Sequence, residues 1–418
     1  MNRTPRRSNL VVSAWRRERP HRTVESPFPR AALWRMSREA TNPGRPSPRE
    51  EKLSVGSTKR AQTGKATSSA PAAAANPTIV QPSLVSVSTA LGWLSSMSLV
   101  EAIKRDALAL GFNAVGISQV AEHAQHSALS TETQSLYGRL TEWLQRGYQG
   151  AMSWMTRDPA RRSDPQLVLP GCRSMISVGM NYYTNNRADE KPGMGRIARY
   201  AWGKDYHLLM SQRLAQLETK IAALAPGVTT KSYSDTGPIM EKAWAQQAGL
   251  GWIGKHSNLV SADCGSWLLL GEILTTLDLT ADEPATDLCG SCTLCIQACP
   301  TGAIVEPYVV DARLCISYLT IELRGGREVI SDELASKMGN RIFGCDDCLD
   351  VCPFNLRTDA VNEPAFAPTP LTLAPNLQAL SQISQEDFST TFKESPLKRA
   401  KLSGLLRNVS IAQKNLSR

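Results

Sequence analysis

The chain has too few cysteines, too unevenly placed, for a disulfide-stabilised scaffold. Only 10 cysteines occur in 418 residues, and eight of them lie between positions 289 and 352. Small secreted scaffolds spread their cysteines through a much shorter chain. At roughly 150 residues per domain, this chain is instead expected to form two or three domains with buried cores.

Long apolar runs are also missing. The uncharged stretch 66–100 is rich in Ser, Thr and Pro and falls short of the roughly 20 apolar residues that a membrane helix needs. Arg6 and Arg7 faintly resemble a twin-arginine signal, but Arg16 and Arg17 interrupt the apolar run that follows. A signal peptide needs about 7 to 15 apolar residues there. We therefore expect no membrane span, no export and a cytoplasmic location.

Positive charge is concentrated at the two ends of the chain. Residues 1–97 contain 16 Lys and Arg against 5 Asp and Glu, with 10 of the 25 prolines. Such a segment cannot bury enough apolar surface to offset its conformational entropy, so we expect a disordered basic extension. Residues 98–392 carry a net charge of −8, and residues 393–418 carry +6. The overall charge of +9 is therefore no evidence that the middle of the chain binds nucleic acid.

After residue 98, helical and strand patterns alternate. This order predicts an α/β (α+β layered) domain over residues 98–284. A cysteine-dense domain over 285–357 and a segment over 358–418, a Pro-rich linker with a C-terminal helix, follow. Lys398, Arg399, Lys401 and Arg407 are predicted to flank the apolar face of that last helix. The predicted helices span 99–110, 136–146, 205–224 and 240–247, and the predicted strands span 114–117, 175–180, 231–233 and 267–275.

The cysteine spacing is typical of a protein with two iron-sulfur clusters. The first run is C-x2-C-x2-C-x3-C-P from Cys289 to Pro300, as in bacterial ferredoxins, where the fourth cysteine ligates the other cluster. The second run, from Cys345 to Pro353, lacks its first cysteine, and Cys315 is the nearby cysteine that can replace it. The predicted ligand sets are Cys289, Cys292, Cys295 and Cys352 for one cluster, and Cys299, Cys315, Cys345 and Cys348 for the other.

Zinc is the alternative occupant, because C-x2-C is also zinc spacing. Zinc needs neither the third close cysteine nor the two Cys-Pro endings, so iron-sulfur is favoured. Cys172 and Cys264 are left over and are read as small buried hydrophobic residues. Because a large α/β domain precedes the clusters, we expect a redox enzyme whose clusters feed a separate catalytic centre.

Three segments of the α/β domain contain candidate functional residues. Asp235, between a strand and a helix, is either a proton donor or part of a helix cap, and the local sequence does not decide between them. The Gly-rich segment 249–258 either approaches a large planar ligand or forms a helix C-cap and a turn. The Asp205-x-His207 pair resembles a cobalt-ligating motif, but Met210 replaces its glycine, so a packed or N-terminal surface histidine is favoured.

Together, these motifs resemble the epoxyqueuosine reductase family. The resemblance covers about residues 99–418 and rests on residues 195–207, 234–238, 248–255 and 339–348 and on the eight-cysteine pattern. It implies a cobalamin-binding α/β domain without a histidine below the cobalt, a ferredoxin-like domain with two 4Fe-4S clusters, and a short C-terminal helical segment. The clusters would relay electrons to cobalt.

The resemblance also implies the substrate and the reaction. The substrate would be epoxyqueuosine at the wobble position of tRNAs with a GUN anticodon, those for Asn, Asp, His and Tyr. The epoxide would be deoxygenated to an alkene with two electrons from an external reductant of unknown identity. One chain can house both relay and substrate site, so we expect a monomer. The family usually continues into helical repeats that help to hold tRNA, and here only about one helix pair follows.

Site residues follow from the resemblance by position. Asp235 takes the proton-donor position, and we expect burial to raise its pKa so that it keeps a proton near neutral pH. Arg157, Lys242, Gly254 and Ser257, together with Asp235, fall where the family contacts cobalamin. Lys242 replaces the usual arginine, which changes its hydrogen-bonding geometry.

Two other classes of protein share parts of this pattern. A cobalamin-dependent reductive dehalogenase also joins cobalamin to two clusters, but it would need a complete twin-arginine signal. A ferredoxin-like electron carrier would bind no corrinoid and show no tRNA-dependent turnover.

Overall fold

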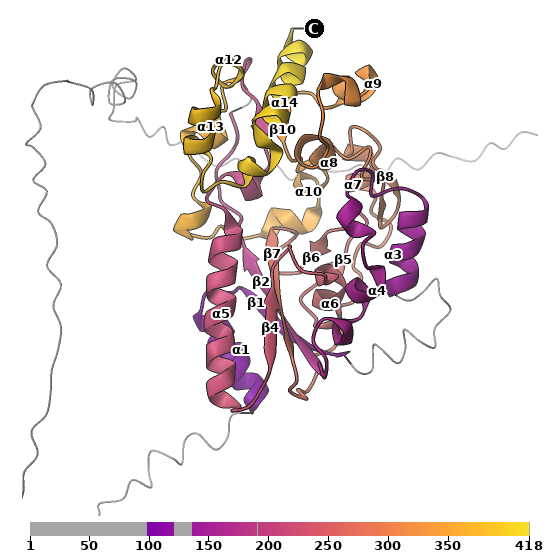
Figure 1. Ribbon diagram of the computed structural model, residues 1–418, viewed down its shortest axis with the longest axis vertical. Helices are drawn as coiled ribbons and strands as arrows, with labels where there is room; N and C mark the ends of the chain where they lie inside the picture. Colours follow the sequence, from indigo (N-terminus) through magenta and orange to yellow (C-terminus); the bar gives the residue numbers. More distant parts are fainter. Residues whose placement is uncertain (1–97, 121–135, 190, 418) are drawn as a thin grey trace, which may run out of the picture. The chain divides into compact units, whose positions relative to one another are not determined.

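The computed structural model describes residues 98–120, 136–189 and 191–417 (Figure 1). The basic extension expected over 1–97 lies outside the described residues. By their contacts, all the described residues belong to one unit. None of the helices in the described ranges has the length and apolarity to cross a membrane.

A four-stranded sheet forms the centre of the N-terminal part of this unit. Its order is β1-β2-β7-β4, and each neighbouring pair is antiparallel. The alternating helices and strands therefore form an α+β layer, in which successive strands run in opposite directions. The strands are β1 (Ala114–Gln119), β2 (Ser174–Asn181), β4 (Thr230–Tyr233) and β7 (Leu268–Thr275).

Helices cover both faces of the sheet (Figure 1). On one face, α1 (Leu99–Ala109) and α5 (Tyr206–Leu224) bury their apolar residues against β1, β2 and β7. On the other, α6 (Glu241–Gln247) inserts Trp244 beside Met175 and Leu274. The eight elements predicted between residues 99 and 275 are confirmed, with ends that differ by a few residues at most.

The cysteine-rich segment consists of short elements beside the sheet domain. Its strand β10 pairs in parallel with β3 (Arg196–Ile197), which lies far earlier in the chain. The elements are α7 (Leu294–Ala298), β8 (Ile304–Glu306), β9 (Val309–Val310), α8 (Ile316–Ile321), α9 (Asp332–Lys337), β10 (Arg341–Phe343) and α10 (Asp347–Asp350).

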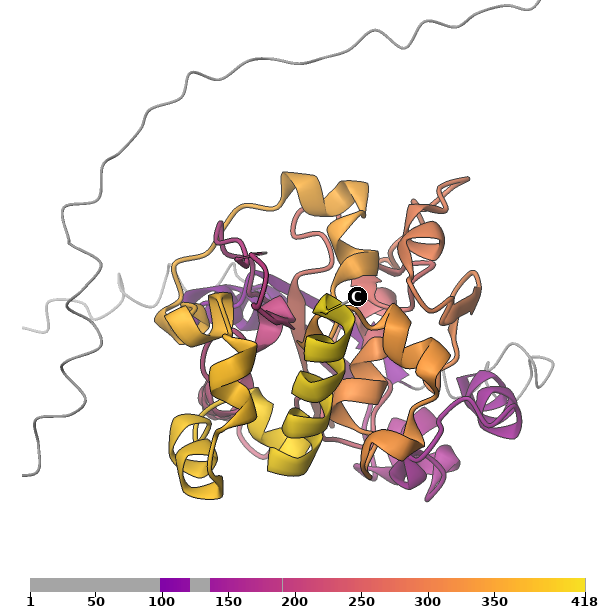
Figure 2. The ribbon, with the colours of Figure 1, turned by 90° about the horizontal axis from the view of Figure 1, so that it is seen from above.

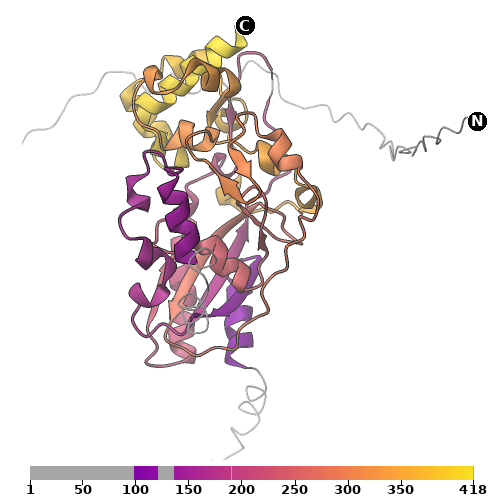
Figure 3. The ribbon, with the colours of Figure 1, turned by 90° about the vertical axis from the view of Figure 1, so that its right-hand side faces the viewer.

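Helices at the C-terminal end pack over β3 and β10. Seen from above in Figure 2, α14 (yellow) lies beside the cysteine-rich segment (orange), and Figure 3 shows it at the end of the unit opposite α1 (indigo). The core there contains Ile342, Phe343, Leu405 and Val409. The elements are α11 (Pro370–Leu373), α12 (Leu377–Ser381), α13 (Gln385–Thr391), the 3-10 helix η8 (Pro396–Ala400) and α14 (Lys401–Leu416).

Of the four basic residues predicted to flank the last helix, Lys398 and Arg399 lie on η8, before that helix begins. Arg407 lies on α14. Its side chain is buried and donates hydrogen bonds to the carbonyl oxygens of Leu319 and Leu323, at the end of α8 and just beyond it. The neighbouring Asn408, also buried, donates to the carbonyl oxygens of Thr320 and Ile342. Together, the two residues tie α14 to α8 and β10. The helical period placed Arg407 beside the apolar stripe but could not reveal these carbonyl partners.

Candidate active site

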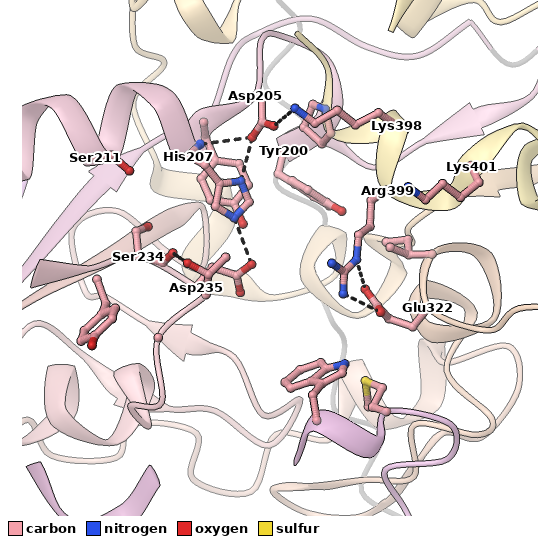
Figure 4. Close-up of a pocket in the computed structure, with 18 of the residues that line it drawn as sticks. Tyr200, Asp205, His207, Ser211, Ser234, Asp235, Glu322, Lys398, Arg399 and Lys401 are labelled. Carbon is pink, nitrogen blue, oxygen red and sulfur yellow. Dashed lines mark hydrogen bonds and ion pairs between the residues drawn. The ribbon is translucent and has the colours of Figure 1, made fainter. Parts of the chain in front are cut away.

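A cavity of about 1540 Å³ lies where several segments of the chain meet. Its lining comes from α4 (Pro159–Ser163) and the turn before it, the start of α5, the loop after β4, the end of α8, α13 and η8. Two predicted site residues, Asp235 and Arg157, line the cavity. Figure 4 shows Asp235 and His207 on one side of it and the ion pair of Arg399 with Glu322 opposite.

The backbone holds Asp235 in an unusual conformation at the edge of the sheet. Its φ is 61°, in the left-handed region that Asp tolerates better than most residues. The backbone N–H of Asp235 donates to the Glu241 carboxylate in the first turn of α6, and the Ser234 hydroxyl donates to the Leu270 carbonyl at 2.7 Å. A side chain at Gly237 would collide with the Tyr233 ring at 2.4 Å. The turn thus aims the Asp235 carboxylate into the cavity instead of capping α6.

A line of hydrogen bonds connects Asp235 to η8 (Figure 4). Lys398 Nζ lies 2.9 Å from Asp205 Oδ2, and Asp205 Oδ1 lies 2.7 Å from His207 Nδ1. His207 Nε2 lies 3.2 Å from Asp235 Oδ2. Asp205 is the N-cap of α5, so His207 is indeed an N-terminal histidine of that helix. Its contact with Asp235, 28 positions later, is a functional feature that the sequence analysis missed.

This line corrects the prediction of a raised pKa for Asp235. The hydrogen bond from His207 lowers the pKa of Asp235, against the opposing effect of burial. Conversely, hydrogen bonds to Asp205 and Asp235 raise the pKa of His207 to about 9. The prediction considered burial alone, and 62% of the Asp235 side chain is accessible in the cavity. Near neutral pH, the charged pair is therefore an imidazolium beside a carboxylate.

The other three predicted cofactor contacts gather outside the cavity lining. Lys242 Nζ donates to the Ser257 carbonyl and to Asn258 Oδ1, both at 2.9 Å. The Gly254 N–H donates to the Asn258 carbonyl at 2.9 Å. Lys242, Gly254 and Ser257 thus form one cluster at the turn between β5 (Trp252–Ile253) and β6 (Leu259–Val260). Asp235 is close enough to Lys242 to raise the pKa of the lysine, although burial lowers it overall.

The glycines of segment 249–258 form a helix C-cap and a turn, as one of the two interpretations predicts. Gly249 has φ +78° directly after the α6 C-cap, and a side chain at Gly251 would meet the Val260 carbonyl oxygen at 2.2 Å. These glycines let β5 pack tightly against β6. The segment also supports the first cysteine loop, because Lys255 Nζ donates to the carbonyls of Gly290 and Cys292 at 2.6 and 2.9 Å.

The first cysteine group comes together around β5. Cys289 and Cys352 pack with Trp252, whose indole N–H donates to Cys289 Sγ at 3.4 Å. Burial raises the pKa of Cys352, and the nearby thiols of Cys289 and Cys292 raise it further. Burial also raises the pKa of Cys295, and the thiols of Cys289 and Cys292 raise it further. Cys352 is thus brought to the three cysteines of the first run, 57 or more positions earlier.

The second cysteine group contains the lone Cys315. Burial raises the pKa of Cys348, and the thiols of Cys345, Cys315 and Cys299 also raise it. The N–H of Ala303 donates to Cys299 Sγ at 3.2 Å, a contact of the kind that tunes cluster potentials. Among the described residues, no three His, Cys, Asp or Glu side chains gather closely enough to hold a single metal ion.

One methionine lies between the second cysteine group and the cavity. Met152 lines the cavity and also packs in the apolar cluster that contains Cys315 and Cys345. Of the two remaining cysteines, Cys172 is fully buried, as expected, whereas Cys264 is only half-buried.

Comparison with known proteins identifies the two conserved parts of this arrangement. Residues 162–236 match the family model "Epoxyqueuosine reductase QueG, DUF1730". Residues 288–355 match the "4Fe-4S double cluster binding domain". The fold and the cysteine groups therefore define an iron-sulfur oxidoreductase of mixed α/β content, and zinc is not the metal of this domain.

The relatives specify the family. The chain is 44% identical over 303 residues to the epoxyqueuosine reductase of Synechocystis sp., covering 72% of this chain and all of the relative. It is 41% identical over 321 residues to the Escherichia coli K12 enzyme, covering 76% and 81%. A crystal structure of epoxyqueuosine reductase with an epoxyqueuosine-modified tRNA-Tyr stem loop superposes with a TM-score of 0.68 at 31% identity, covering 76% and 81%. The chain belongs to the epoxyqueuosine reductase family, oxidoreductases that act in tRNA modification.

Proposed function

We propose that this chain reduces the epoxide of epoxyqueuosine at the wobble position of GUN-anticodon tRNAs, and that the described cavity is the reaction site. One observation carries the proposal. The same cavity is lined by the Asp235 carboxylate and by Met152, which packs beside Cys315 and Cys345. A proton-transfer group thus lines the cavity, and one apolar cluster contains both a residue of the cavity wall and two cysteines of the second group.

The cavity fits cobalamin and a nucleoside together. Its volume of about 1540 Å³ exceeds the roughly 300–1,000 Å³ of most small-molecule sites. We assign the cofactor contacts to Arg157 and Asp235 in the cavity wall and to Lys242, Gly254 and Ser257 beside it. When bound, cobalamin supplies a strongly reducing centre for opening the epoxide. His207 is held by Asp205 and Asp235, which leaves it unsuited to ligate cobalt.

The cysteines hold the two 4Fe-4S clusters in two sets of four. These sets are Cys289, Cys292, Cys295 and Cys352, and Cys299, Cys315, Cys345 and Cys348. The thiols within each set influence one another electrostatically. The second set lies nearer the cavity through Met152, so we assign it the last step of the electron relay from an external reductant.

Asp235 donates the proton. Cleavage of the epoxide C–O bond leaves an alkoxide-like oxygen, which a carboxylic acid within hydrogen-bond reach protonates. The turn from Ser234 to Gly237 presents the carboxylate to the cavity. In a relative from Bacillus subtilis, 30% identical, a solved structure has the catalytic aspartate loop swung out of the active site. We expect the Asp235 turn to move similarly when substrate enters.

The chain is further proposed to act as a cytoplasmic monomer, with clusters, cofactor site and proton donor on one chain. The test uses the full chain, purified without oxygen and loaded with clusters and cobalamin. Epoxyqueuosine-containing tRNA stem loop and a strong chemical reductant are added, and queuosine is measured by mass spectrometry. If fully loaded enzyme forms no queuosine, the proposed function is wrong.

The variant Asp235→Asn tests the proton donor. General acid catalysis typically contributes about 10²- to 10⁴-fold, and we expect a loss of that size in kcat. The matched control is Asp332→Asn, which changes an exposed aspartate on α9 that pairs with Arg327 and should leave kcat unchanged. Full activity in Asp235→Asn would contradict the assigned role and leave the proposed reaction standing.

A further inference from the structure

Both ring nitrogens of His207 contact carboxylates. Nδ1 lies 2.7 Å from Asp205 Oδ1, and Nε2 lies 3.2 Å from Asp235 Oδ2. An ionised carboxylate can only accept hydrogen bonds, and a neutral imidazole has one N–H to donate. Both contacts are hydrogen bonds when His207 carries a proton on each nitrogen and both carboxylates are ionised.

The structure fixes His207 in this position. Asp205, with 8% of its side chain exposed, also accepts the His207 backbone N–H at 3.2 Å and pairs with Lys398. The Tyr206 ring stacks on the imidazole, with ring centres 4.2 Å apart. The imidazole nevertheless stays reachable, because 33% of the His207 side chain is exposed on the cavity side.

The other charged groups around His207 have hydrogen-bond or ion-pair partners of their own and do not replace Asp205 or Asp235 at the imidazole. Glu241 on α6 accepts the Asp235 backbone N–H, and Lys242 next to it is held by Ser257 and Asn258. Across the cavity, the Arg399 guanidinium is paired with Glu322. The groups facing His207 from all elements are Asp205, Asp235, Lys398, Tyr200, Tyr206, Glu241, Lys242, Glu322 and Arg399.

The charges place the proton on the histidine. Hydrogen bonds to Asp205 and Asp235 raise the pKa of His207 to about 9, while the bond from His207 lowers the pKa of Asp235. Asp235 alone is therefore a poor proton reservoir near neutral pH. It needs a neighbour that delivers a proton when one is used.

We propose that His207 is a positioning residue that stores the active-site proton and reloads Asp235 in each turnover. This inference rests on the proposed function. The Nε2–H bond of the imidazolium breaks as an O–H bond forms on the Asp235 carboxylate, and that O–H bond then breaks as the proton passes to the oxygen released from the epoxide. Neutral His207 keeps its Nδ1–H on Asp205 and takes a proton at Nε2 from water in the cavity. Each transfer thus consumes one solvent proton and moves no electron, and two transfers, with the two electrons of the reaction, release the oxygen as water.

The first test is chemical rescue in the fully loaded full chain. His207→Ala should lower kcat about 10- to 100-fold, and added imidazole should restore much of it. A series of substituted imidazoles should restore kcat according to their own pKa values, which a purely structural role would not produce. The matched control, Leu208→Ala, changes an exposed neighbour on the same helix and should neither lose activity nor respond to imidazole.

The pH dependence of kcat distinguishes a His207 that stores a proton from a His207 with a purely structural role. Wild-type kcat should fall as pH rises through about 9, where His207 loses its proton. His207→Gln keeps side-chain hydrogen bonds but cannot titrate there, so its kcat should be low and lack this alkaline limb. An unchanged alkaline limb in His207→Gln, or no rescue of His207→Ala by any imidazole, would overturn the proposal.

A direct readout needs no turnover. In the full chain with ¹⁵N-labelled histidine and without cobalamin, the His207 ring should be doubly protonated at pH 7.5 by NMR. Asp235→Asn should shift its titration to lower pH because one carboxylate partner is gone. A neutral His207 at pH 7.5 would overturn the proposal even if wild-type enzyme makes queuosine. If wild-type enzyme makes none, the proposed function fails instead, whatever the NMR result.

Discussion

The two cysteine groups and the Asp235 cavity are built in opposite ways. Seven of the eight cysteines lie in two short runs, separated from the next cysteine by two or three residues, so the chain itself holds most of each group together. The cavity instead collects residues from α4, α5, the β4–α6 loop, α8, α13 and η8. Its central contact joins His207 and Asp235, which are 28 positions apart on different elements.

This difference separates two kinds of information. Ligand spacing is a local constraint that a cluster imposes directly on the sequence. Hydrogen bonding between distant side chains depends on how helices pack on the sheet, and the same Asp or His would suit a surface cap equally well. Substitutions at residues that are close in sequence to their partners and at residues that are distant from them should therefore have different effects in the two regions.

The largest effect is expected where the cysteine region itself depends on a distant residue. Cys315→Ala should remove one cluster, lower the iron content from about eight to about four atoms per chain and abolish turnover. Iron analysis and the visible absorbance of the anaerobic protein measure the loss. Cys264→Ala, a change outside both groups, should keep all the iron. Full iron content in Cys315→Ala would show that the group is completed differently.

A smaller effect is expected for Asn408, which joins α8, the helix after Cys315, to β10, the strand before Cys345. Asn408→Ala leaves the carbonyls of Thr320 and Ile342 without their buried donor. At about 1–3 kcal/mol for each of the two unsatisfied buried carbonyls, the free energy of unfolding should fall by about 2–6 kcal/mol. Urea denaturation measures it, with Ser410→Ala on the exposed side of α14 as a control that should change it by less than about 0.5 kcal/mol.

The His207 contacts should make a pH-dependent contribution to stability. The pKa of His207 is raised from 6.5 to about 9, so its contribution is complete below about pH 6.5 and is lost as pH rises through 9. After allowance for solvent screening, we expect about 1 kcal/mol. The difference in unfolding free energy between wild type and His207→Gln should shrink between pH 6 and pH 10. A constant difference would contradict the imidazolium pair.

The smallest effect is expected at the basic rim of the cavity. Lys398 and Arg399 pair with Asp205 and Glu322, whereas Lys401 is exposed and makes no ion pair with the described residues. Lys401→Asn, which removes the charge and keeps a polar side chain, should weaken tRNA binding a few-fold. The slope of log K against log salt should fall by about 0.7. Lys337→Asn on α9 should change neither.

Much of the architecture was accessible from the sequence. Periodicity located the helices and strands of the sheet domain, because amphipathic faces repeat at 3.6 and 2 residues. It also placed Arg407 beside the apolar face of the last helix, but period alone cannot distinguish a solvated edge from one that faces buried carbonyls, as the edge at Arg407 does. Arg157 and Asp235 were expected at the site and line the cavity, whereas the other three proposed cofactor contacts lie beside it.

By itself, the sequence determined the cluster chemistry, since thiolate spacing is written into two short runs. It also determined the sheet domain and the presence of an acid after β4. Only the tertiary structure decided the protonation of that acid. Burial alone would raise the pKa of Asp235. The N-terminus of α5 brings His207 to Asp235, and the hydrogen bond between them lowers that pKa instead. The physical reason is that a pKa reports all nearby charges and dipoles, and those neighbours are assembled by packing rather than by position in the chain.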